Sequence, residues 1–245
     1  DYLNKNNIKS IIIDHHEINN PFPKSDVVIN PKKKIIEKEK SFLCATALTF
    51  FFIDILIKKT KSNFILSKFL IYVLLATICD VMPLRKINKI IAHNTIDNFK
   101  IQNNLALNHI FEQFNLKKKL TIDDLGFLIG PIINSGGRLN KSNYGVELLS
   151  TDNLEIIKDR SSKLIALNNK RKIIEQSILD EIDFEKIKKE NKNVVIYYKD
   201  NLNEGLIGII ASRLKDYFNK PSIVITKSNN EFKASARSTT IYNIG

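Results

Sequence analysis

A pair of adjacent histidines, His15 and His16, follows Asp14 and the apolar run Ile11–Ile13. Three β-branched residues in a row predict a strand buried on both faces. The polar residues would then lie at the carboxyl end of that strand, the edge of an open α/β sheet where ligands bind. An imidazole binds divalent metal, and a neighbouring carboxylate can orient the ring. Asp14, His15 and His16 are therefore candidate catalytic residues, with a solvated loop as the alternative.

Asp80 is the second candidate, because it ends a long apolar segment, Tyr72–Cys79. A lone carboxylate there would cost several kcal/mol, which a bound cation would offset. Pairing with Arg85 or Lys86 would serve equally well. The residues alone leave both interpretations open.

A glycine-bearing segment, Asn134–Leu139, offers a different chemistry. Gly136 and Gly137 would let backbone N–H groups approach an oxyanion closely, and Arg138 beside them would clamp a phosphate with two hydrogen bonds. The alternative is a plain glycine turn with a solvent-exposed arginine.

Together these segments resemble the DHH phosphoesterase superfamily, and in particular its RecJ branch of single-strand-specific exonucleases. Asp14–His16 resembles the superfamily signature. Ala76–Leu84 resembles the RecJ-type stretch whose aspartate binds catalytic metal, which favours Asp80 as a ligand. Asn134–Leu139 resembles the family's Asn-Ala-Ala-Gly-Arg element, with Ser and Gly in the two middle places.

The resemblance continues near the end of the chain. Gly205–Leu214 resembles the opening of the family's accessory domain, DHHA1, where Gly205 and Gly208 would leave a helix N-terminus open to phosphate. Family members often have Trp-His just before this segment, where Leu202 and Asn203 stand here. Ser235–Ser238 resembles the family's Ser-Gly-Arg-Ser, with Ala for Gly, which implies that Ser235, Arg237 and Ser238 bind the nucleic-acid strand.

The resemblance implies a 5′-to-3′ exonuclease that removes nucleotides from single-stranded DNA in recombination and repair. Its cofactors would be two divalent ions, Mn²⁺ or Mg²⁺, which activate water and neutralise charge in phosphoryl transfer. His15 and Asp80 would be metal ligands, and His16 would lie near the scissile phosphate. Arg138 would bind the 5′-terminal phosphate. A single-strand-binding protein and a helicase are expected protein partners, and a monomer is the expected state.

The family's other metal-binding aspartates come from two strands upstream of the signature. The chain begins at Asp1 without an initiating Met. We therefore expect a fragment that lacks those aspartates and the C-terminal end, and that is inactive or nearly so by itself.

Two other functions remain open. A relative that cleaves short oligonucleotides or cyclic dinucleotides would share the histidine pair, but the oligonucleotide-cleaving branch typically carries a Gly-Gly-Gly-His element that this sequence lacks. The second alternative is a DNA-binding scaffold whose catalytic site has decayed. This alternative is disfavoured because the candidate catalytic residues are intact: Asp14, His15, His16 and Asp80.

Composition adds weaker constraints. Lys and Arg outnumber Asp and Glu by 38 to 26, which gives a net charge of +12 and suits an anionic partner. A lysine-rich coding habit would give the same excess. The two cysteines, Cys44 and Cys79, lie in apolar runs and predict buried thiols in a reducing compartment, the cytoplasm. The apolar run Phe69–Cys79 is shorter than the about 20 residues of a membrane span.

The elements that must position these residues predict an α/β fold. Residues 1–150 would form a DHH domain with a parallel sheet and many helices, including two apolar helices over 42–57 and 63–79. Residues 151–190, without Gly or Pro up to Lys189, would form one long connecting helix. Residues 191–245 would form a smaller α/β DHHA1 domain with strands at 193–198, 222–226 and 232–235. Single-stranded DNA would lie between the two lobes.

Overall fold

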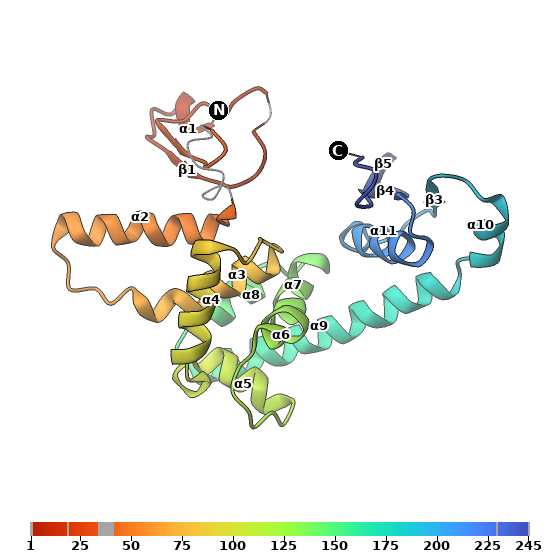
Figure 1. Cartoon of the computed structure of the whole chain (residues 1–245). Coiled ribbons are helices and arrows are strands. Elements are labelled where there is room, and N and C mark those ends of the chain that lie inside the picture. Colours follow the sequence, from red (N-terminus) through yellow and green to blue (C-terminus); the bar gives the residue numbers. More distant parts are fainter. Residues whose placement is uncertain (1, 19, 34–41, 229, 245) are drawn as a thin grey trace. The chain divides into compact units, whose positions relative to one another are not determined.

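Figure 1 shows the computed structural model, which describes residues 2–18, 20–33, 42–228 and 230–244 of the chain. The chain folds as two compact units, Asp1–Gly130 and Pro131–Gly245. The predicted domain limits at residues 150 and 190 both fall in the second unit and stay a prediction. The structure contains many helices, a parallel sheet and a sheet with both parallel and antiparallel strands, which confirms the predicted α/β class.

The first unit is mostly helical. Its elements are α1 (Tyr2–Lys5), β1 (Ile11–Ile13), β2 (Val27–Ile29), α2 (Ala45–Thr60), η2 (Ser67–Phe69), α3 (Leu70–Cys79), α4 (Lys86–Asn98), η3 (Ile101–Asn103), α5 (Leu105–Gln113), α6 (Ile122–Asp124) and the π-helical segment η4 (Leu125–Ile129).

The strand predicted from the isoleucine run is present, but its burial was predicted wrongly. β1 pairs in parallel with β2, with Ile11 opposite Val27 and Ile13 opposite Ile29. Ile11 is 54% exposed and Val27 is 45% exposed. Among the described residues this sheet has only two strands, so both are edge strands and their side chains are less buried than those of a central strand in a wider sheet.

The core of the first unit is built around α3, which contacts α2, α4 and η4. Ile71 and Leu74 of α3 are fully buried, as are Leu107 and Phe111 of α5. The apolar helix predicted over 63–79 is therefore present as α3, in the core. The apolar helix predicted over 42–57 is present as α2, but its one buried residue among those described is Ala47.

The start of α6 is held by a capping box. The carboxylate of Asp124 accepts hydrogen bonds from the N–H of Thr121 at 2.9 Å, its hydroxyl at 2.7 Å and Lys118 Nζ at 2.7 Å. The N–H of Asp124 in turn donates to the Thr121 hydroxyl at 3.2 Å. Burial alone raises the pKa of Asp124, but the hydrogen bonds from Lys118 and Thr121 outweigh burial and hold that pKa below its usual value.

The second unit contains the remaining elements. They are α7 (Gly130–Arg138, which starts at the last residue of the first unit), α8 (Asn143–Leu149), α9 (Leu154–Asp180), α10 (Phe184–Glu190), β3 (Val195–Tyr198), α11 (Glu204–Phe218), β4 (Ser222–Ser228) and β5 (Glu231–Arg237).

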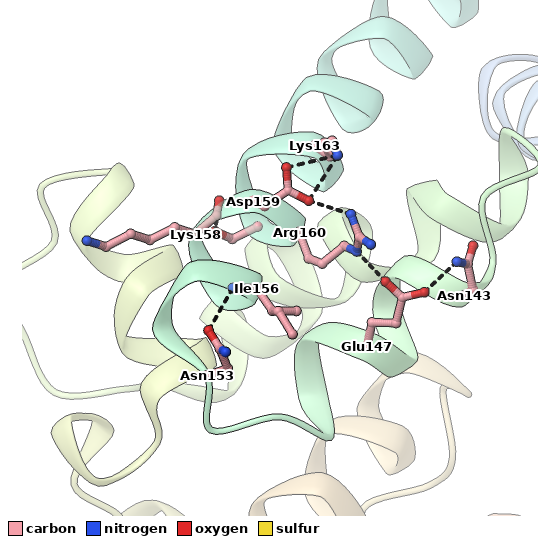
Figure 2. A network of polar contacts seen from close by, with 9 residues as sticks. Asn143, Glu147, Asn153, Ile156, Lys158, Asp159, Arg160 and Lys163 are labelled. Carbon is pink, nitrogen blue, oxygen red and sulfur yellow. Dashed lines mark hydrogen bonds and ion pairs between the residues drawn. The ribbon is translucent and has the colours of Figure 1, made fainter.

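The predicted long helix is α9, and it starts where the sequence indicated. The side chain of Asn153 caps it by accepting from the N–H groups of Glu155 and Ile156. Figure 2 shows how Arg160 of α9 binds Glu147 of α8, which ties the first turns of α9 to the preceding helix. The single helix predicted up to residue 189 is wrong, because α9 ends at Asp180 and Asp183 caps a separate helix, α10.

The sheet of the second unit has the order β3-β4-β5, with β3 and β4 parallel and β4 and β5 antiparallel. All three predicted strands are present. Helix α11 packs against β4 and β5 (Figure 1). The apolar core beside them includes Val195, Ile210, Ala211, Leu214 and Val224, each at most 4% exposed.

A close backbone approach joins α11 to the end of α7. A Cβ atom on Gly205 would press against the carbonyl oxygen of Arg138 and lie 2.8 Å from its Cα. In return, Nη1 of Arg138 donates a hydrogen bond to the carbonyl of Gly205 at 3.0 Å. Only glycine fits at this position.

We expect Asp124→Asn to lower the free energy of unfolding by about 1–2 kcal/mol at pH 7, because Asn loses the charge and one acceptor oxygen of the capping box. The folded pKa of Asp124 lies below the usual value of about 3.9, so its contribution is present above about pH 4 and lost as the pH falls through the folded pKa. Urea titrations at pH 7 and at low pH measure this. The control Asp123→Asn changes an exposed neighbour, and equal losses in both variants would contradict the assignment.

We expect Gly205→Ala to lower the free energy of unfolding by about 1–3 kcal/mol, because the new methyl group meets backbone that cannot move freely. Gly137→Ala is the matched control, since a Cβ there meets nothing within 4 Å. Alanine in that helix should instead stabilise by up to about 1 kcal/mol. Urea denaturation of both variants tests the close approach, which would be refuted by a stable Gly205→Ala.

Candidate functional site

The structure brings His15 and Asp80 together in the first unit. Nε2 of His15 lies 3.7 Å from Oδ2 of Asp80, and the two side chains are 13% and 44% exposed. His15 follows β1 and Asp80 follows α3, so two elements distant in the sequence supply the pair. An imidazole nitrogen and a carboxylate oxygen at this separation can bind the same divalent ion.

The end of α3 places Asp80 at the rim of the core. The N–H of Asp80 bonds to the carbonyl of Ala76, and the chain then turns at Val81, whose φ is +53°. A carboxylate at a helix C-terminus meets the negative end of the helix dipole, so a nearby cation stabilises it. Among the described residues Asp80 forms an ion pair with His15 and none with Arg85. Pairing with Lys86 stays the alternative.

Asp14 orients the second histidine. Oδ1 of Asp14 lies 2.7 Å from Nδ1 of His16, and this hydrogen bond holds the pKa of Asp14 below its usual value. The carbonyl of His16 accepts from Asn30 at 3.0 Å. The His16 side chain is 79% exposed, and its ring packs edge-on against that of His15 with centroids 4.6 Å apart. His16 is therefore fixed beside His15 and faces solvent.

These residues supply only part of a metal site. In the described part of the chain no group of three or more His, Cys, Asp or Glu side chains converges. A catalytic metal keeps three or more protein ligands, and a two-metal site needs more. His15 and Asp80 thus fit as two ligands of a larger set.

The glycine segment lies in a helix, which the sequence did not predict. Gly136 and Gly137 lie in the last turns of α7, and neither has a positive φ. Helical N–H groups there bond to carbonyls four residues earlier, so they do not face an oxyanion. Gly136 instead allows close packing, since a Cβ on it would lie 2.7 Å from the carbonyl oxygen of Lys141 and 3.0 Å from Leu164.

Arg138, at the end of α7, remains available for an anion. Burial lowers the pKa of Arg138, and the positive charges of Arg171 and Arg237 lower it further. Its hydrogen-bond partner is the neutral carbonyl of Gly205. A half-buried guanidinium among other guanidinium groups favours a bound anion.

Ser235 and Arg237 of β5 lie against the same helix, α11. A Cβ on Gly208 would be 2.7 Å from Nη2 of Arg237 and 3.2 Å from Oγ of Ser235. Gly205 and Gly208 thus place Arg138, Ser235 and Arg237 along the first turns of α11. Ser238 is not shown to join them; its hydroxyl contacts Asn243 and the N–H of Ile244.

Sequence reasoning missed the role of Asn203. Its side chain caps α11 by accepting from the N–H of Gly205 at 2.9 Å, and Leu202 beside it is buried in the core. The helix N-terminus predicted to be open to phosphate therefore has this N–H occupied. An Asn before Glu204 at a helix start is the signal that would have revealed the cap.

No family model matches the chain. The chain is 29% identical, over 97% of its length, to the single-stranded-DNA-specific exonuclease RecJ of Haemophilus influenzae. It is 30% identical, over 94% of its length, to the protein of the same name from Salmonella typhimurium. It spans 44% and 43% of these relatives, less than half of each.

Two solved structures share the fold. RecJ of Thermus thermophilus in complex with Mn²⁺ superposes with a TM-score of 0.80 at 21% identity, over 91% of this chain and 33% of that one. An exonuclease RecJ bound to manganese gives a TM-score of 0.78 at 21% identity, over 98% of this chain and 59% of that one. Over nearly all of its length, the chain is therefore similar in sequence to these RecJ exonucleases, and it shares the fold of the two solved structures.

Proposed function

We propose that this chain forms part of a single-stranded-DNA-specific exonuclease that hydrolyses phosphodiester bonds from the 5′ end, in DNA recombination and repair. The names of its relatives and the manganese-bound structures that share its fold support the proposal. Single-stranded DNA is the proposed partner, with a single-strand-binding protein and a helicase as protein partners of a cytoplasmic monomer. In the described part of the chain, no helix has both the length and the apolar character of a membrane span.

The single observation that carries the proposal is the approach of His15 to Asp80 at 3.7 Å. His15 and Asp80 would hold a divalent ion, Mn²⁺ or Mg²⁺. Such ions, when bound, activate water and neutralise the charge that develops on the phosphate. His16, oriented by Asp14, would contact the scissile phosphate from the exposed side of the pair.

The second unit would bind the strand. Arg138 and Arg237 each offer a planar fork of donors that matches phosphate oxygens, and the Ser235 hydroxyl adds a further donor. These groups contact backbone and not bases, so binding would be independent of sequence and weakened by salt. The proposed phosphate-binding residues do not include Gly136 and Gly137, which lie within helix α7, or Ser238, whose hydroxyl contacts Asn243 and Ile244.

We expect the 245-residue chain to bind Mn²⁺ weakly, because only two ligands converge among the described residues. Asp80→Asn should abolish the weak binding, since it removes one of the two. Asp97→Asn is the matched control, an exposed carboxylate that pairs with His93 on α4. Isothermal titration calorimetry measures all three proteins, and tight binding of two ions by the unaltered chain would contradict the expectation.

We expect the product of the complete reading frame to release mononucleotides from 5′-phosphorylated single-stranded DNA in the presence of Mn²⁺. His15→Ala should be at least about 100-fold slower, as loss of a metal ligand produces. Gel analysis of timed reactions on single-stranded and duplex DNA makes the measurement.

His93→Ala is the control for that assay, because the His93 side chain is 74% exposed and pairs with Asp97, so it is no part of the His15–Asp80 pair. Cleavage of duplex at the same rate would exclude single-strand specificity. DNA binding without cleavage by the unaltered protein would favour the scaffold, and faster cleavage of dinucleotides than of long strands would favour the small-substrate enzyme.

A further inference from the structure

A valine in the left-handed conformation follows the candidate metal ligand Asp80. Val81 has a φ of +53° and lies just past the end of α3, in a Schellman motif. Its N–H donates to the carbonyl of Ile78 at 3.0 Å, and the N–H of Met82 donates to the carbonyl of Thr77 at 3.0 Å. Glycine is the usual residue at this position because it has no Cβ, whereas a β-branched side chain is strained there.

The chain uses other residue types at its other left-handed positions. Among the described residues, ten that are not glycine have a positive φ, and seven of these ten are asparagines. Two others are Lys61 and Lys86, and Val81 is the one β-branched residue in this set. Asparagine tolerates the left-handed conformation because its short polar side chain can bond to the nearby backbone. Backbone preference therefore does not explain the valine at position 81.

Packing within the described part of the chain does not explain the valine either. The Val81 side chain is 86% exposed, and an apolar side chain gains free energy only when it is removed from water. Pro83 and Leu84, which follow it, are exposed as well. A run of exposed apolar residues is typical of a surface that contacts another molecule.

The exposed segment is nevertheless held in place. Asn88 of α4 is 1% exposed, and its Nδ2 donates to the carbonyl of Pro83 at 3.0 Å and to that of Phe42 at 2.8 Å. The N–H of Arg85 also donates to the carbonyl of Pro83, at 2.9 Å. With the Schellman motif at its start, the segment Val81–Leu84 is fixed at both ends, which is typical of a preformed binding surface.

The position of Val81 beside Asp80 identifies the molecule that it contacts. Asp80 lies 3.7 Å from His15, and in the proposed function this pair receives a phosphate of the DNA strand. The apolar atoms nearest to such a phosphate are the C–H groups of the two sugars bonded to it, while the bases lie farther away. An exposed valine next to the metal ligand therefore matches a sugar.

We propose that Val81 is a further substrate-binding residue, whose methyl groups pack against a sugar next to the scissile phosphate. This inference rests on the proposed function, which brings the scissile phosphate to the His15–Asp80 pair. Burial of the methyl groups in the complex offsets the strain that the left-handed conformation imposes on the free protein.

Val81→Asn tests the inference because it should move two measurements in opposite directions. Asparagine relaxes the backbone, so the urea midpoint of the 245-residue chain should stay equal or rise. The variant also loses the apolar contact, so kcat/KM of the complete reading frame's product on 5′-phosphorylated single-stranded DNA with Mn²⁺ should fall about fivefold or more. A fall in both measurements would give Val81 a structural role and overturn the inference.

Lys61→Asn is the matched control, because Lys61 has a φ of +52° at the end of α2 and is exposed. It makes the same backbone change away from the residues assigned to the site, so kcat/KM should change by less than about twofold. Val81→Ile keeps a β-branched apolar side chain and should also stay within about twofold of the unaltered protein. An unchanged kcat/KM in Val81→Asn, or equal losses in Val81→Asn and Val81→Ile, would overturn the inference.

A second substrate distinguishes a sugar contact from a base contact. A strand whose two 5′-terminal nucleotides are abasic keeps both sugars next to the scissile phosphate, so the loss in Val81→Asn relative to the unaltered protein should persist. Disappearance of that loss would assign Val81 to a base and contradict the proposal.

The His15→Ala variant separates this inference from the proposed function. If the unaltered protein cleaves the strand and His15→Ala is at least about 100-fold slower, the proposed function stands and the Val81 variants alone decide the inference. If the unaltered protein cleaves no DNA, the proposed function and this inference both fall.

Discussion

The approach of His15 to Asp80 depends on the burial of α3. Ile71 and Leu74 fix this helix in the core of the first unit, and the chain leaves it at Asp80 by a turn through the positive φ of Val81. The carboxylate therefore lies where a buried helix ends, next to the imidazole of His15, which follows β1. Rigid elements hold both groups, which keeps the geometry of a metal site within narrow limits.

Helix α11 has the corresponding role in the second unit. One of its faces is buried against the sheet, and two glycines on another part of its surface let the backbone of Arg138 and the side chain of Arg237 come close. Charged groups are thus concentrated beside a helix whose position is set by apolar contacts. Bringing the guanidinium groups together costs free energy because they repel one another. In the free protein the apolar packing of α11 offsets this repulsion, and in the proposed complex a bound anion would offset it as well.

Much of the fold follows from local pattern. The strands, the start of the long helix α9 and the apolar helix α3 were predicted because apolar periodicity and capping residues act within a few residues of one another. The glycine segment was predicted to bind an oxyanion or to form a turn, but it forms the end of α7. Glycine has low helix propensity, yet contact with Leu164 and Lys141 leaves no space for a side chain at Gly136, and tertiary packing outweighs propensity.

The sequence by itself determined which residue types follow each apolar element: Asp14, His15 and His16 after a strand, and Asp80 after a helix. Only the tertiary structure decided which of them meet. His15 pairs with Asp80 while Asp14 pairs with His16, and Glu175 lies between Arg171 and Arg213. The local sequence pattern decides whether a segment forms a helix or a strand. Distances between side chains that are remote in sequence depend on how whole helices and strands pack, and a short stretch of sequence does not contain that information.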